Sequence, residues 1–252
     1  MKNKVPKGNT QKSVNALVFS LLNRFFPNRS LKSLIDVPCG EGEFLNFIST
    51  KFPTAQLVGI DRFASGGVRH GETPASKDGN TFTFFKQNAQ AYFAEQNPKE
   101  VEAITCISGV MCFDGIHDLF QQFHHALTPG GHAIVTNDNI MTMRDRVNFL
   151  FFGHFKRFKL FYDRNEGNWN IMTPQALIML FERYDFVKIN IKYTSIYWED
   201  IAWLPLALIF YPFFLLKVLF AKGPSSFKSR LALYPFRSLL ARHYVIWVQK
   251  KL

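Results

Sequence analysis

The chain has 252 residues, of which 47% are apolar and 16% aromatic, and its formal net charge is +11. These values are typical of a globular chain that is long enough to bury a sizeable core. The three cysteines, Cys39, Cys106 and Cys112, lack the spacing of metal ligands, and their odd number argues against a disulfide framework, so a reducing cytosolic compartment fits.

The first thirty residues are basic and are not typical of a signal peptide. Four lysines precede a short apolar run, but Asn23 and Arg24 interrupt that run and no small-residue cleavage site follows it. We expect Ser13 to cap an amphipathic helix over residues 14–26 that lies against the domain. Residues 1–30 are therefore predicted as a basic tail and helix, and residues 31–252 as the main domain.

Residues 31–140 alternate short apolar runs with helical patterns. This alternation predicts a mostly parallel sheet covered by helices. A helix over 118–127 should end at Thr128-Pro-Gly-Gly131, where we expect a turn. The predicted strands of this part of the chain are 33–37, 55–61, 81–85, 103–108 and 132–136.

The pattern changes after residue 140. Residues 141–172 mix Phe and Leu with Arg and Lys, and we expect them to face the substrate or a membrane. Thr173 and Pro174 predict a helix start, because Thr caps helices well and Pro is tolerated in the first turn. Two more strands are predicted at 186–193 and 244–249.

Residues 195–243 form a predicted insertion between these two strands, and within it residues 201–220 are almost entirely apolar. The flanking strands share one sheet, so a single membrane crossing would place them on opposite sides. A second crossing would bury the basic residues of 227–242, at a cost of at least about 2.5 kcal/mol each. We therefore expect 201–220 to form a bent helix, kinked near Pro205 and Pro212, that dips into one leaflet and precedes a basic helix in the headgroup plane. The alternative is a buried lid that packs on the domain or on a partner subunit.

Most of the net positive charge lies in the half of the chain that contains this insertion. Residues 141–252 hold seventeen Lys and Arg against seven Asp and Glu, whereas residues 1–140 hold thirteen against twelve. A basic and very apolar half indicates monotopic contact with an anionic membrane surface, from its cytoplasmic face, more than contact with nucleic acid.

The sequence PCGEGEF at 38–44 follows the first strand and leads into a helix. Gly40 and Gly42 allow a sharp turn close to a ligand, and the helix N-terminus behind them offers free N–H groups. Asp61 follows the second strand, where an acid can accept two hydrogen bonds from a ribose diol.

A dinucleotide suits this loop poorly. Leu45 stands where the third glycine of a dinucleotide-binding loop would be. Glu41 and Glu43 also place two negative charges where a diphosphate would lie, so a cationic ligand fits better.

Together, DVPCGEGEF at 36–44, GID at 59–61 and LTPGG at 127–131 resemble the class I S-adenosylmethionine-dependent methyltransferases, including the type 11 and quinone-biosynthesis members. The resemblance covers about residues 31–140 and the last strands. It implies an α/β fold with a doubly wound, mostly parallel seven-stranded sheet and an antiparallel last strand. It also implies S-adenosylmethionine as the cofactor and no metal. The cofactor-binding residues that it implies are Asp36, Pro38, Cys39, Gly40, Gly42, Asp61, Arg62, Asn88, Ala89, Ser108 and Gly109.

Two of these positions, and one pair of residues outside the set, carry alternatives or departures. An Asn at position 88 that merely caps a helix would look the same as one that reads the adenine. Pro38 replaces a glycine that is common in the family. Cys112 and Phe113 stand where many relatives have Glu-His, so the family's general base is absent there.

His117 and His154 are the candidate catalytic residues, and the alternative for each is a solvated or core histidine. The patterns together predict methyl transfer to a lipophilic acceptor, such as a lipid, a quinone precursor or a lipid-linked phenol, with O-methylation favoured over C-methylation. Methyl transfer needs mainly alignment of the acceptor with the methyl carbon, so a missing base does not exclude it. Two alternatives are an RNA methyltransferase that binds phosphates with the basic half, and a non-catalytic, membrane-anchored S-adenosylmethionine-binding protein.

Overall fold

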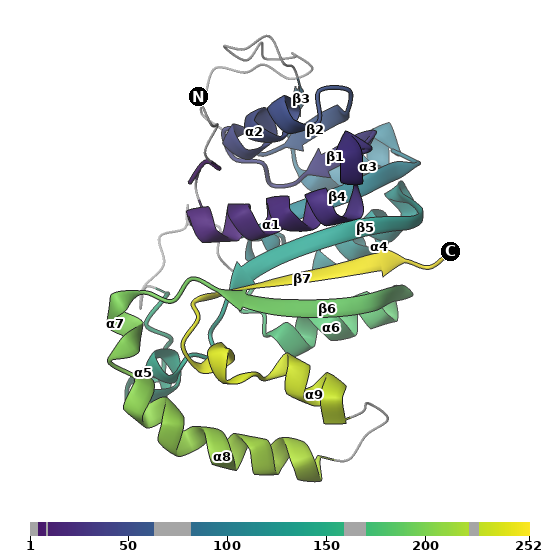
Figure 1. Ribbon diagram of the computed structural model, residues 1–252. Helices are drawn as coiled ribbons and strands as arrows, with labels where there is room; N and C mark the ends of the chain where they lie inside the picture. Colours follow the sequence, from purple (N-terminus) through teal and green to yellow (C-terminus); the bar gives the residue numbers. More distant parts are fainter. Residues whose placement is uncertain (1–4, 9, 63–81, 159–169, 222–226) are drawn as a thin grey trace.

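The computed structural model of the chain describes residues 5–8, 10–62, 82–158, 170–221 and 227–252 (Figure 1). Its centre is a seven-stranded sheet in the order β3-β2-β1-β4-β5-β7-β6. β7 runs antiparallel to both of its neighbours, and the other pairs are parallel. The predicted fold class is thus confirmed. The strands are β1 Ser33–Asp36, β2 Gln56–Ile60, β3 Thr83–Phe85, β4 Val101–Ile107, β5 Leu127–Asp138, β6 Phe186–Thr194 and β7 His243–Lys250.

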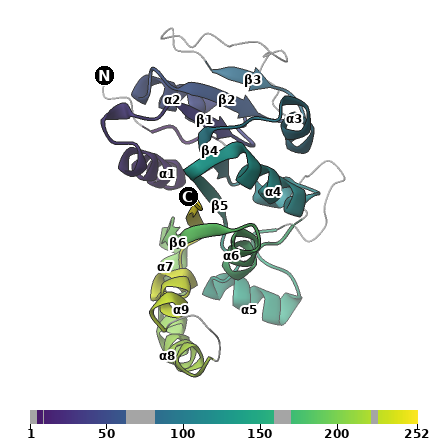
Figure 2. The same cartoon turned by 90° about the vertical axis from the view of Figure 1, so that its right-hand side faces the viewer.

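Helices cover both faces of this sheet (Figures 1 and 2). Successive strand residues face opposite sides, so Leu34 and Ile35 belong to two separate cores. The core around Leu34 packs against α1 and α2, and the core around Ile35 packs against α3, α4 and α6. The helices are α1 Lys12–Phe25, α2 Glu43–Lys51, α3 Ala89–Gln96, α4 Ile116–Ala126, α5 Met143–Phe152, α6 Pro174–Arg183, α7 Trp198–Ile201, α8 Leu204–Phe220 and α9 Phe227–Leu233. Short 3₁₀ helices are η1 Pro27–Arg29, η2 Val110–Cys112 and η3 Phe236–Leu239.

Two predicted helix ends differ from the structure. α1 begins at Lys12 with Gln11 at the cap position, and Ser13 instead makes a hydroxyl–hydroxyl hydrogen bond of 2.6 Å to Ser195. The LTPGG run is not a free turn, because β5 already begins at Leu127. The run forms a bulged start to this strand, where the pairing register with β4 shifts and Gly130 has a φ of +79°.

The start of α6 is as predicted. Its first residue is Pro174, and the Thr173 hydroxyl accepts a hydrogen bond from the Ala176 N–H. This cap fixes where the chain re-enters the sheet region before β6.

The helices α5, α7, α8 and α9 lie together with η3 beyond the β6 edge of the sheet (Figures 1 and 2). We call this group the helical lobe. It contains the described parts of the predicted 141–172 segment and of the 195–243 insertion; residues 159–169 and 222–226 lie outside the described residues. Among the described helices, none has both the length and the apolar character that crossing a bilayer requires.

The two prolines of the apolar run act differently from each other. The bend predicted near Pro205 is a break, since α7 ends at Ile201 and α8 begins at Leu204 with Pro205 in its first turn. Pro212 lies inside α8. The single basic helix predicted over 227–242 is wrong, because Pro235 separates α9 from η3 and has no N–H to continue a helix.

Candidate cofactor pocket

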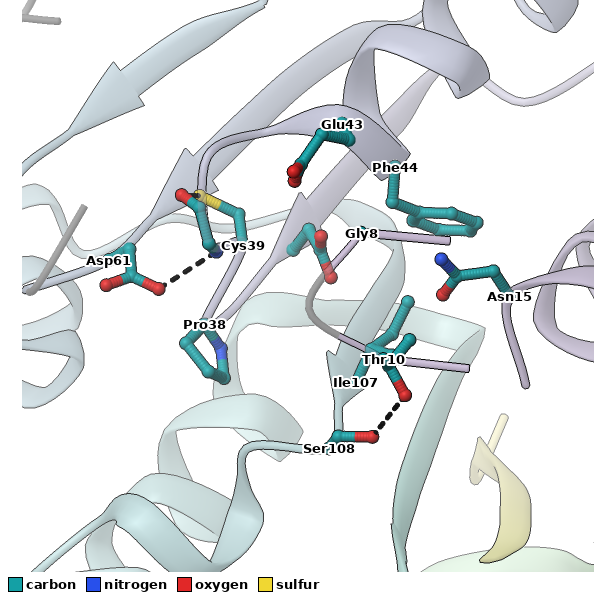
Figure 3. Close-up of a pocket in the computed structure, with 12 residues that line it drawn as sticks. Gly8, Thr10, Asn15, Pro38, Cys39, Glu43, Phe44, Asp61, Ile107 and Ser108 are labelled. Atoms are coloured by element: carbon teal, nitrogen blue, oxygen red, sulfur yellow. Dashed lines mark hydrogen bonds between the residues drawn. The ribbon is translucent and has the colours of Figure 1, made fainter. Parts of the chain in front are cut away.

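A pocket of about 200 Å³ opens where β1, β2 and β4 end (Figure 3). The carboxyl ends of the strands are the usual ligand-binding edge of a doubly wound sheet. Three of the lining residues are acidic and none of the described lining residues is basic, so the pocket suits a positively charged ligand. It is lined by Gly8, Thr10, Asn15, Asp36, Pro38, Cys39, Gly40, Glu43, Phe44, Asp61, Ile107 and Ser108.

The glycine loop between β1 and α2 forms one wall of the pocket. Gly40 and Gly42 have φ values of +58° and +79°, in the left-handed region that favours glycine. The Gly40 N–H donates a hydrogen bond of 2.9 Å to Oδ2 of Asp61, as Figure 3 shows. A Cβ at Gly42 would lie 2.4 Å from the Phe82 ring. Asp61 therefore holds the loop as well as facing the pocket, and Gly42 shapes the loop from behind.

Pro38 and Gly109 pack against each other at the floor of the pocket. The Val37–Pro38 peptide is cis, and a Cβ at Gly109 would lie 2.0 Å from Cδ of Pro38. The side chain that Pro38 adds to the usual loop is thus accommodated by the absence of one at Gly109.

Asp36 is the most perturbed acid of the pocket. It is buried, and Thr105 donates a hydroxyl hydrogen bond of 2.6 Å to its Oδ1. Burial raises the pKa of Asp36 from 3.8 to about 7; the nearby Asp61 charge also raises it, and the Thr105 bond lowers it. A bound cation would favour the ionised form, so the acid is poised to respond to a positively charged cofactor.

The segment before α1 closes the pocket on the opposite side from the glycine loop. The Thr10 hydroxyl makes a hydrogen bond of 2.7 Å with the Ser108 hydroxyl (Figure 3). The amide nitrogen of Asn15 donates to the carbonyls of Pro6 and Lys7, at 3.1 and 3.2 Å. These bonds orient the amide, and its Oδ1 is buried with no hydrogen-bond partner among the described residues. An ammonium or hydroxyl donor on a ligand would satisfy this oxygen, which fits the implied cofactor.

No sequence pattern indicated this N-terminal wall. Gly8 and Thr10 lie in the predicted basic tail, and Asn15 lies in the predicted helix over 14–26. The Ser108 partner of Thr10 is distant in the chain, and nothing about position 15 in a helical pattern indicates that its side chain faces a pocket. No periodic pattern reports such a contact.

Six of the eleven predicted cofactor-binding residues line the pocket, and five do not. Gly42 and Gly109 shape it from behind. Asn88 caps α3 by accepting from the Gln90 N–H at 2.8 Å, Ala89 is in the core, and Arg62 is exposed just after Asp61. Contact of these five with the cofactor stays a prediction.

Neither candidate catalytic histidine lines the described pocket. His117 is in the first turn of α4, where its Nδ1 lies 3.3 Å from the Tyr184 hydroxyl. His154 follows α5 in the helical lobe and lies near Phe152. Cys112, at the position of the family's usual base, has its thiol pKa raised by burial, so it is protonated at neutral pH.

The described thiols are unreactive by the same reasoning. Burial raises the pKa values of Cys39 and Cys106 well above their usual range, so both remain protonated. Cys39 contributes shape to the pocket wall and no charge.

Comparison with known proteins agrees with this geometry. A family model described as a methyltransferase domain matches residues 10–191. No curated protein matches the sequence. The fold resembles a SAM-dependent methyltransferase from Archaeoglobus fulgidus, with a TM-score of 0.55 and 16% identity over 94% of each chain.

Two further solved structures were determined with a cofactor product bound. Phosphoethanolamine N-methyltransferase 2 of Haemonchus contortus, in complex with phosphomonomethylethanolamine and S-adenosylhomocysteine, has a TM-score of 0.54 and 15% identity, over 94% of this chain and 53% of that one. The plantazolicin methyltransferase BpumL, in complex with SAH, has a TM-score of 0.51 and 15% identity, over 95% of this chain and 83% of that one. At these identities the likeness concerns the fold.

Proposed function

We infer that this protein, which belongs to the methyltransferase-domain family and is an S-adenosylmethionine-dependent methyltransferase, methylates a lipophilic acceptor at a membrane surface. Bound S-adenosylmethionine supplies an electrophilic methyl group for in-line displacement. The acids and the glycine loop described above would bind and orient that cation. The nature of the acceptor and the place of action are proposals, and the observation that carries both is the exposed apolar surface of the helical lobe.

α8 is apolar on two opposite sides, and one of them packs inside the lobe. Ala207, Tyr211, Phe214 and Val218 follow helical spacing, and Ala207 and Val218 are buried. The Tyr211 ring packs edge-on against Phe236, with centroids 5.1 Å apart. This stripe packs α8 on its neighbours in the lobe.

The opposite side of α8 is equally apolar but has nothing over it among the described residues. Ile209, Phe213, Leu216 and Phe220 are 61%, 65%, 51% and 75% exposed. A soluble helix normally places polar residues on this side, and large exposed apolar patches mark interaction sites. Water is a poor environment for this surface, and the apolar part of a leaflet is a suitable one.

The C-terminal end of α5 extends the same surface. Leu150, Phe151 and Phe152 are 76%, 71% and 69% exposed, and Trp198 at the start of α7 is 83% exposed. Exposed Phe and Leu together with Trp are typical of segments that lie in a membrane interface. The basic excess of this half of the chain adds attraction to anionic lipid. These features support monotopic contact from the cytoplasmic side.

We favour oxygen over carbon as the acceptor atom. A hydroxyl acceptor needs to lose one proton, whereas most carbon acceptors need a stabilised carbanion and a stronger base. The described lining of the pocket offers carboxylates and no basic side chain. An acidic phenol on a lipid or quinone precursor suits such a site.

The test incubates the full-length protein with radiolabelled methyl donor and lipids extracted from the host, dispersed in detergent. We expect label in a lipid fraction with the wild type, none with Asp61→Asn, and unchanged labelling with Glu95→Gln, an exposed acid on α3. Label in RNA instead of lipid would support the RNA methyltransferase. Cofactor binding without transfer to any lipid or RNA would contradict the lipophilic acceptor.

A further inference from the structure

A groove of about 740 Å³ runs between α5 and α8, on the apolar surface of the lobe and away from the cofactor pocket. Its walls are mainly aromatic and aliphatic, and no acidic residue is among the described lining residues. Groove-lining residues from α5 include Phe149 and Leu150, and those from α8 include Phe210 and Phe213. A hydrocarbon chain is the shape and chemistry that such walls accept.

Arg146 is the unusual feature of the groove. It lies on α5, its guanidinium carbon is 4.4 Å from the centre of the Phe214 ring, and its Nε donates to the Met141 carbonyl at 2.8 Å. Stacking and this one bond hold the guanidinium plane in place. No hydrogen bond joins its two terminal nitrogens to another described residue, and Arg146 is one of the residues that line the groove. A guanidinium can offer a ligand there a planar pair of donors.

The charge of Arg146 also has no acidic partner. No carboxylate of the described chain forms an ion pair with it, in contrast to Arg144 and Arg242 of the same lobe, which both contact Asp200. Burial lowers the pKa of Arg146, and the nearby Tyr234 and Tyr193 act in the opposite direction. Lys217 on α8 lines the same groove and adds a second positive charge.

We propose that the groove between α5 and α8 binds one anionic phospholipid of the bilayer, with the lipid phosphate on Arg146 and an acyl chain along the aromatic walls. This inference rests on the proposed membrane contact and adds a defined lipid site to it. A phosphate matches the planar donor pair of the guanidinium, and the chain fills a groove that water would leave poorly solvated. The bilayer is the source of both parts because the exposed side of α8 is continuous with the groove.

The test measures co-sedimentation of the full-length protein with vesicles of phosphatidylcholine, alone or mixed with phosphatidylglycerol. Arg146→Gln should weaken binding to the mixed vesicles about tenfold, as expected for losing hydrogen bonds to a charged group. Lys99→Gln removes the same charge from an exposed site outside the lobe and should leave binding unchanged. Arg146→Lys, which keeps the charge without the planar donor pair, should be intermediate.

A second measurement locates the lipid. Phosphatidylglycerol with a photoreactive acyl chain should label peptides of α5 and α8, and Phe213→Asp should abolish that labelling by placing a carboxylate at an exposed position of the groove. Equal binding of wild type and Arg146→Gln to the mixed vesicles, or labelling elsewhere in the chain, would overturn the proposal. The proposal would also be overturned if soluble glycerol phosphate displaced the photoreactive lipid as well as unlabelled phosphatidylglycerol does, since the acyl chain would then contribute nothing to binding.

Failure of this site and failure of the proposed function give different results. Arg146→Gln should bind S-adenosylmethionine normally and still methylate detergent-dispersed lipid. If lipid is labelled but Arg146→Gln binds vesicles like the wild type, only the lipid site is wrong. If no lipid is ever labelled but vesicle binding depends on Arg146, only the acceptor assignment is wrong.

Discussion

The sheet region and the helical lobe use apolar residues in opposite ways. In the sheet region, large apolar side chains lie in two closed cores, and three acidic side chains line the pocket at the carboxyl ends of the strands. In the lobe, many of the largest apolar side chains are on the surface, and a polar contact lies inside, where the Nε–H of Arg242 donates to both carboxylate oxygens of the buried Asp200. The difference indicates that one region is built for a small polar ligand in water and the other for a second, apolar environment.

If the sheet region and the helical lobe work separately, a change in the cofactor pocket should leave membrane binding by the lobe intact. Replacing Asp61 tests this, and it has the largest expected effect. Asp61→Ala removes the bond to Gly40 and the predicted bonds to the ribose. Losing two charge-assisted hydrogen bonds should weaken S-adenosylmethionine binding about a hundredfold or more. Isothermal titration measures this loss. Vesicle binding should remain at the wild-type level, and a parallel loss of both would show that the two regions are coupled.

Gly109 tests how tightly the floor of the pocket is packed. Gly109→Ala places a methyl group against the rigid ring of Pro38, so we expect a loss of about 1–3 kcal/mol in the free energy of unfolding. Urea denaturation monitored by circular dichroism gives the value. Gly115→Ala is the matched control, because its nearest neighbours are the flexible ends of Asp118 and Gln90. Similar effects at both glycines would contradict the packing role of Gly109.

The raised pKa of Asp36 predicts that stability and cofactor affinity depend on pH, whereas membrane binding by the lobe does not. The pKa of Asp36 is raised to about 7 in the folded protein, so the folded state holds a proton that the unfolded state has lost between about pH 4 and pH 7. The stability of the cofactor-free protein should therefore fall as pH rises through this range. Affinity for the cationic cofactor should change the other way, because only ionised Asp36 attracts it.

We expect cofactor affinity to rise about tenfold between pH 6 and pH 8 and then to level off. Asp36→Asn should flatten that profile, and titration at several pH values measures it. An unchanged profile in the variant would assign the dependence to another group. Vesicle binding, which depends on the arginine of the lobe, should be flat over the same range.

Asn15 tests the wall that the sequence did not reveal. Asn15→Leu keeps the size of the side chain and removes the unpartnered oxygen together with the two bonds to Pro6 and Lys7. Loss of one hydrogen bond to the cofactor should lower affinity about fivefold. Asn23→Leu, also on α1, is the control and should bind normally. Unchanged affinity of the Asn15 variant would exclude that oxygen as a ligand.

The sequence was informative where structure is local or periodic. All seven strands were predictable because buried strands form short apolar runs and the edge strand β6 alternates apolar with polar residues. The glycine loop was predictable because its turn needs residues without a Cβ. Thr173 and Pro174 marked a helix start for equally local reasons. These features also carry the family resemblance.

Prediction failed where a residue's partner is distant. Ser13 is a good cap in isolation, but its hydroxyl binds Ser195 instead. Thr10 was expected in the basic tail and Asn15 in the helix over 14–26, but neither was expected to line the pocket, which Thr10 closes by a bond to the distant Ser108 and Asn15 by an amide held on the preceding backbone. The lobe was recognised as apolar and basic, but only the structure shows Arg146 without a counter-ion between two apolar helices.

The smallest expected effect is on the free energy of unfolding when the outer side of α8 is changed. It distinguishes an outer side that contacts lipid from one that is covered by protein. If the outer side of α8 contacts only lipid, polar residues there should cost little in water. Ile209→Ser and Phe213→Ser should change the free energy of unfolding by no more than about 0.5 kcal/mol, while reducing vesicle binding. Ala207→Asp, on the buried side of the same helix, should be strongly destabilising because it buries an unpaired charge. Thermal and urea denaturation of the detergent-free protein decide between the cases.

A large loss of stability for Phe213→Ser would mean that another part of the protein, or a second copy of it, covers α8. The lobe would then be a buried lid, which is the alternative that the sequence analysis left open.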